Sequence, residues 1–96
     1  MLNEKIHGPF HETSIMSQNL KDVMRTGKTW GDMSDPQIEA LEFIATHLAW
    51  ILTGDRDHRA HWEGLAEYAR LGGTISKPNM PTVTFDLEAA IKGDAQ

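Results

Sequence analysis

Residues 34–55, "SDPQIEALEFIATHLAWILTGD", carry the clearest helix signal in the chain. Ser34 stands at the N-cap position, Pro36 falls in the first turn, and Gln37 occupies the capping-box position. Gly54 is a typical helix stop. Between these signals the apolar residues recur at helical spacing and form one face, made of Ile38, Leu41, Ile44, Ala45, Leu48, Ile51 and Leu52.

Two aromatic residues give this helix a second apolar face. Phe43 and Trp50 lie one heptad apart, opposite the aliphatic face, because successive helical residues are rotated by about 100°. A helix that is apolar on two faces is typical of the centre of a bundle or of a subunit interface. We therefore expect a central helix, Phe43 and Trp50 at an interface, and a homo-oligomer. Self-association would also add to the modest stability of a domain of 96 residues.

A shorter helix is expected on each side of the central one. The first is predicted over about 14–26, after an irregular arm over residues 1–12 whose Gly-Pro pair is a loop signal. The other begins near Asp57, a good N-cap, and ends at the glycine pair 72–73. Its short connection to the central helix predicts an antiparallel hairpin. The predicted fold class is therefore all-α, with a three-helix core.

The C-terminal part of the chain has a different pattern. Residues 74–85 contain two prolines and little helical periodicity, which predicts an extended arm. The stretch "DLEAAIKG", residues 86–93, can add a short helix at the end of that arm. The predicted organisation is a helical domain over residues 1–73 followed by an arm over residues 74–96.

The composition restricts the classes of function. A net charge of −5 argues against nonspecific nucleic-acid binding, which needs a basic surface. The absence of cysteine excludes disulfides and thiolate metal sites. No signal peptide is apparent, and the longest apolar run is too short to span a bilayer. We expect a protein of the cytoplasm that does not bind membranes.

The stretch "GDRDHRAHW", residues 54–62, is a candidate site. It places Asp55 and Asp57 beside His58 and His61, which are spaced so that their rings lie on one side of a helix. Two such histidines and a carboxylate can hold a divalent metal, and a helix N-terminus attracts phosphate. The same residues also fit a purely structural helix start, with Asp57 as the N-cap.

A second candidate site lies in the central helix. Glu39 and Glu42 are three residues apart, so their carboxylates can share a Mg²⁺ ion, which prefers oxygen ligands. Glutamate pairs are also common on the solvated edges of helices. This alternative stays open at the level of the sequence.

Three stretches carry a family resemblance: "HGPF" near the start, "ALEFIATHLAWILTGD", and "HWEGLAEYARL". Together they resemble an uncharacterised family of small proteins from bacteriophages and proteobacterial prophages, over residues 7 to about 72. The resemblance implies a phage origin and an all-α fold, and it carries no established activity. The positions that it shares are His7, Gly8, Glu42, Gly54, Asp55, His61, Trp62, Glu63 and Tyr68.

A more distant likeness is to the MazG-type all-α nucleotide pyrophosphohydrolases, which hold Mg²⁺ with ExxE on one helix and ExxD on the next. Glu39-x-x-Glu42 matches the first half of that pattern. The second half is missing, because Glu63 is followed three residues later by Ala66.

Two classes of function follow. The first is a nucleotide-directed enzyme or binder with a Mg²⁺ site, in which a histidine contacts phosphate or shuttles a proton. Its residues would be Glu39, Glu42, Asp55 and Asp57 around the metal, with His58 and His61 as the catalytic pair. The second is a non-enzymatic phage interaction protein that inhibits or redirects a host factor, such as an anti-CRISPR or other anti-defence protein. An enzyme needs converging carboxylates in a cleft, whereas a binder needs an exposed apolar or acidic surface.

Overall fold

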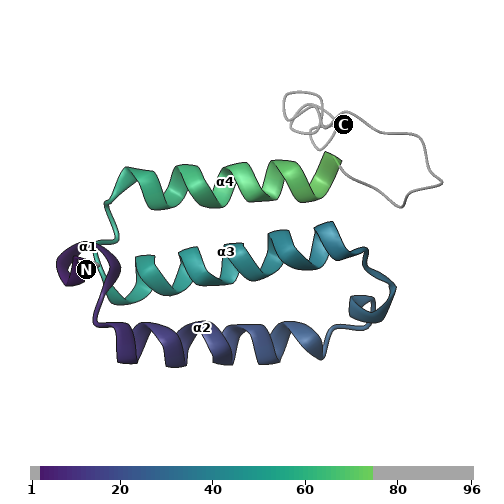
Figure 1. Cartoon of the computed structure of the whole chain (residues 1–96), viewed down its shortest axis with the longest axis horizontal. Helices are drawn as coiled ribbons and strands as arrows, with labels where there is room; N and C mark the ends of the chain where they lie inside the picture. The colour runs from purple at the N-terminus through teal and green to yellow at the C-terminus, as the bar shows by residue number, and fades with distance from the viewer. Residues whose placement is uncertain (1–2, 75–96) are drawn as a thin grey trace, which may run out of the picture.

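The computed structural model describes residues 3–74, and in this range it is helical without strands (Figure 1). The all-α fold is therefore confirmed there. The predicted arm and its short helix lie outside the described residues, apart from Thr74, which ends the last helix. The elements in chain order are α1 (Glu4–His7), α2 (Phe10–Arg25), the 3-10 turn η1 (Trp30–Asp32), α3 (Asp35–Thr53) and α4 (Arg59–Thr74).

The central helix α3 begins and ends where its sequence signals place it. The Ser34 hydroxyl accepts a hydrogen bond from the Gln37 N–H at 3.3 Å, and the Gln37 side chain accepts one from the Ser34 N–H at 3.0 Å. This capping box satisfies two N–H groups that would otherwise lack a partner. At the other end, the Gly54 N–H donates to the Trp50 carbonyl at 2.8 Å and closes the helix.

The prediction of an irregular N-terminal arm is wrong. One helical turn, α1, is capped by Asn3, whose side chain accepts from the Lys5 N–H at 2.9 Å. Helix α2 then begins at Phe10, about four residues earlier than expected. Pro9 is its N-cap, and the Pro9 carbonyl accepts from both the N–H and the hydroxyl of Thr13. A proline at a helix start loses nothing, because the first N–H groups have no partner within the helix.

The three long helices form an open layer. Helix α3 lies between α2 and α4 and runs antiparallel to both (Figure 1). In the described part of the chain, α3 packs closely on α4 and on α2. The predicted antiparallel hairpin of the second and third long helices is thus confirmed. Since α2 and α4 take opposite sides of α3, the layer leaves two broad faces.

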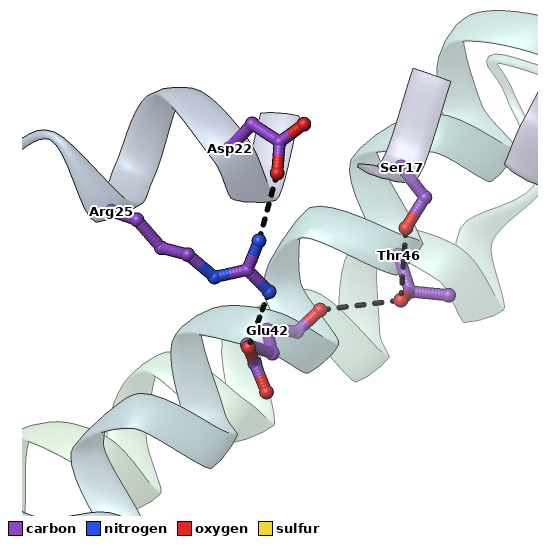
Figure 2. Close-up of polar contacts among 5 residues, drawn as sticks. All are labelled: Ser17, Asp22, Arg25, Glu42 and Thr46. Atoms are coloured by element: carbon purple, nitrogen blue, oxygen red, sulfur yellow. Dashed lines mark hydrogen bonds and ion pairs between the residues drawn. The ribbon is translucent and has the colours of Figure 1, made fainter. Parts of the chain in front are cut away.

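The seam between α2 and α3 consists of small and polar side chains. The hydroxyls of Thr13 and Thr53 lie 2.8 Å apart. Those of Ser17 and Thr46 lie 3.4 Å apart (Figure 2). Thr13 and Ser17 are both buried. Short side chains let two helices approach closely, and each hydroxyl also has a carbonyl or a second hydroxyl within reach.

The buried apolar core of the described residues is small. No large side chain among residues 3–74 is fully buried. Helices of a globular domain normally bury an apolar stripe against another layer. Most large aliphatic side chains of the layer must therefore lie on its faces. The buried apolar residues are Ala40, Ala45, Ala49 and Ile51.

Candidate functional site

The predicted glutamate pair lies beside α2. Glu39 and Glu42 border a shallow polar depression together with Lys21. Arg25 donates to Glu42 at 3.4 Å and to Asp22 at 2.8 Å, so it bridges the two helices (Figure 2). Cationic side chains thus already face the carboxylates that were expected to hold Mg²⁺.

The predicted aspartates lie at the opposite end of α3. The helix rises about 1.5 Å per residue, so Thr53, the residue before the Gly54–Asp55 turn, is about 16 Å from Glu42 along the axis. The four predicted carboxylates therefore occupy two separate places and do not fit one Mg²⁺ ion. Nor does any group of three or more histidine, aspartate and glutamate side chains within residues 3–74 have an arrangement that could hold a metal ion.

The turn into α4 differs from the expected cap. Helix α4 begins at Arg59, two residues after Asp57, so the expectation that Asp57 is the N-cap is wrong. Instead the Asp55 side chain accepts from the Asp57 N–H at 2.9 Å, and the Asp55 carbonyl accepts from the His58 N–H at 3.2 Å. An aspartate that bonds its own backbone two residues on forms a tight turn and competes with the helical conformation.

Three histidines and a tryptophan gather at this end of the layer; we call His7, Trp50, His58 and His61 the histidine corner. His7 Nδ1 and His61 Nε2 are 2.9 Å apart. The ring centroids of His58 and His61 are 4.6 Å apart, and Trp50 lies 5.1 Å from His7 and 5.3 Å from His61. Sequence spacing placed His58 beside His61, but it did not identify His7 as a partner. The only signal for His7 was the "HG" element of the family resemblance.

Two glycines allow the N-terminal turn to dock at the corner. Gly8 has φ +84°, and a Cβ on it would overlap Thr53. A Cβ on Gly54 would overlap the Ile6 carbonyl, which accepts from the Asp55 N–H at 2.9 Å. The "HG" and "GD" pairs are therefore needed for close backbone approach, which brings His7 onto His61.

His61 is enclosed, and its surroundings disfavour the charged imidazolium form. Burial lowers the pKa of His61, the neighbouring imidazoles of His58, His7 and His47 lower it further, and Asp55 opposes them. The side chain is 3% exposed, and its Nδ1 finds no hydrogen-bond partner within residues 3–74. An imidazole so enclosed does not reach a bound phosphate unless His7 moves away. The corner therefore secures the N-terminal turn, with His61 buried and His58 half-buried, and a catalytic role for the two histidines stays a prediction.

Aromatic rings continue from the corner along α3 and α4. Phe43 stacks on Tyr68 with centroids 4.6 Å apart and an interplanar angle of 10°. His47 meets Trp50 edge-on at 4.9 Å, and it fits only because Gly64 has no side chain. Phe43 and Trp50 were expected at a subunit interface. Their ring partners in the described residues belong to the same chain, although Phe43 is still 40% exposed.

The side of the layer opposite Phe43 and Trp50 carries apolar side chains from all three long helices; we call it the open face. Leu41 and Ile44 of α3 line an apolar groove with Ala69 of α4. Val23 is 69% exposed, and Leu52 is 62% exposed. On a helical projection these residues point about a quarter-turn away from the helix seams. The open face consists of Met16, Leu20, Val23, Leu41, Ile44, Leu48, Leu52, Trp62, Leu65 and Ala69.

Comparison with known proteins identifies no relative: no family model, curated protein or solved structure matches the chain. Across residues 3–74, no helix has both the length and the apolar character to cross a membrane. Three features of the molecule bear on its function: the carboxylates that lie in two separate places, the enclosed histidine corner and the open face.

Proposed function

We propose that this protein is a non-enzymatic interaction protein that binds another polypeptide through the open face. The observation that carries the proposal is that α2, α3 and α4 each project apolar side chains to this side, with Val23, Leu52 and Trp62 all more than half exposed. Soluble proteins rarely expose large contiguous apolar patches, and those that do use them to bind partners. This is the second of the two function classes expected from the sequence.

The geometry favours this class over a nucleotide-directed enzyme. Phosphoryl chemistry with a bound metal needs carboxylates that converge on one ion. Here Glu42 is paired with Arg25, and Asp55 is engaged in a turn at the far end of α3. A binder needs none of these groups, and inhibition or redirection of a host factor by contact is compatible with the open face.

Photo-crosslinking in living cells tests the proposal. A benzoylphenylalanine placed at Leu52 would report what covers the open face. The same probe at Phe10 is the control, because Phe10 is 72% exposed and borders a groove with Trp50 on the opposite side of the layer. We expect an adduct with a polypeptide from position 52 and none from position 10. Absence of any adduct from position 52, or equal labelling from both positions, would refute the proposed function.

A further inference from the structure

We propose that the polypeptide bound by the open face is a second copy of this chain, so that two three-helix layers stack face to face. The inference rests on the proposed function, because it names the occupant of the surface described there. It is carried by the burial, the dimensions and the charge distribution of the layer.

The burial among residues 3–74 is too small for a stable domain. In residues 3–74 the buried apolar side chains are three alanines and Ile51. A helical layer needs a second layer against which its apolar side chains can lose water. Residues 3–74 need that layer in order to bury their apolar side chains, before the chain meets a foreign partner. A second copy is present whenever the protein is made.

The dimensions of the open face match those of a second layer. Helices of 16 and 19 residues are about 24–28 Å long. Three helices packed 8–10 Å apart are about 27 Å wide, so the face covers about 700 Å² per copy, or about 1,400 Å² for a pair. Stable interfaces bury roughly 1,200–2,000 Å² in total. A single foreign helix, about 10 Å wide, would cover only a third of the width.

The ion pairs of the three long helices lie away from the open face, and one charged side chain, the exposed Glu12, shares the α2 stripe of Met16 and Val23. The ion pairs Arg59–Glu63 and Arg70–Glu67 lie on the outer edge of α4, opposite its packing stripe. The bridge from Arg25 to Glu42 lies on the other side of the layer, where Glu42 and Phe43 border one depression. Two copies can therefore meet without burying these ion pairs. Their net charges of −5 repel at long range, and added salt should screen that repulsion and tighten the dimer.

Sedimentation equilibrium of the full chain tests the inference. We expect the wild-type protein to have twice the mass of one chain at micromolar concentrations. Leu52→Glu should weaken association at least about tenfold, because each copy would bury an unpaired carboxylate. Phe10→Glu is the matched control on the opposite side and should change the dissociation constant less than about twofold.

A concentration series with the unmodified protein gives a second readout in case Leu52→Glu fails to fold. The Tm of a dimer rises with protein concentration, whereas the Tm of a monomer does not. A wild-type monomer at all concentrations, or equal weakening by both variants, overturns the inference. If a monomer still forms adducts with other proteins from position 52, the proposed function survives without it. Adducts from position 52 to residues 75–96 of the same chain would overturn both.

Discussion

Gly64 offers a direct test of how α3 and α4 pack. It lies in the interior of α4, where alanine normally stabilises a helix by about 1 kcal/mol relative to glycine. A Cβ at this position, however, would lie 2.5 Å from Nε2 and 2.8 Å from Cδ2 of His47. The imidazole must therefore move for Gly64→Ala to fold.

The cost of that movement follows from what His47 contacts. Its Nδ1 lies 2.7 Å from the Phe43 carbonyl, and a hydrogen bond of this kind contributes about 1 kcal/mol. Its edge-on contact with Trp50 contributes about another 1 kcal/mol. Set against the gain in helix propensity, Gly64→Ala should lower the free energy of unfolding by about 1 kcal/mol.

Gly73→Ala is the matched control in the same helix, because a Cβ there would meet nothing within 4 Å. We expect it to raise the free energy of unfolding by up to about 1 kcal/mol, so the two variants should differ in Tm by about 8–16 °C. Thermal unfolding followed by circular dichroism at one fixed protein concentration would measure this difference.

A double-mutant cycle isolates the role of His47. In the His47→Ala background the obstacle is gone, so Gly64→Ala should become stabilising, which gives a coupling of about 2 kcal/mol. If Gly64→Ala stabilises the wild-type protein as much as Gly73→Ala does, the packing of His47 against α4 described above is refuted.

Three further predictions concern the histidine corner and the carboxylates. Gly8→Ala should lower the free energy of unfolding by about 2–4 kcal/mol, because it combines a strained φ with an overlap that undocks α1. Gly31→Ala is the control: with open space around it, it should change the free energy of unfolding by less than about 0.5 kcal/mol. Urea titrations measure both changes. The pKa of His61 is lower in the folded than in the unfolded chain, where it has its ordinary value of 6.5. The free energy of unfolding should therefore fall as the pH drops from 6.5 to the lowered pKa, and it should level off below that pKa. Urea midpoints measured from pH 8 to pH 5 should show this loss, and a His61→Gln variant with an unchanged slope would contradict it. Because Arg25 already pairs with Glu42, Mg²⁺ should change the Tm of wild type and of Glu42→Gln equally in thermal melts; a rise confined to wild type would show that Glu42 binds the ion.

Local signals in the sequence predicted the elements that depend on local chemistry. The capping box of Ser34 and Gln37 fixed the start of α3, and Gly54 marked its end, because each acts within one helical turn. The Gly8-Pro9 pair is also a local signal, but it was interpreted as a loop. Proline also starts helices, and here it precedes α2.

The candidate site depended on long-range contacts that no local pattern contains. His7 meets His61 across 54 residues of sequence, and this contact requires the docking of two backbone segments at Gly8 and Gly54. The carboxylates failed to converge for a simpler reason. Glu42 lies in the N-terminal half of α3 and Asp55 follows the C-terminal end of that helix, so their separation follows from the helical rise.

Helical periodicity also could not show which of the two apolar faces of α3 is covered. Phe43 and Trp50 have ring partners within the chain, and their assignment to an interface stays a prediction, with Phe43 40% exposed. On the aliphatic face, Leu48 is partly covered and Leu52 is largely open. A helical projection shows that α3 has two apolar faces. Which of them is covered depends on where the neighbouring helices lie around α3, and the projection does not contain that information.

The distribution of side chains in the layer explains why its faces, and not its seams, carry the apolar area. Where α2 meets α3, the contacts are between hydroxyls, as between Thr13 and Thr53, and around Ala45 and Ala49. Such seams bring helices close together but remove little apolar surface from water, so they contribute little hydrophobic free energy. The leucines that would supply it are only partly covered, and Leu52 is 62% exposed. On the proposed stacking of two layers, the interaction surface and the missing half of the core are the same set of residues.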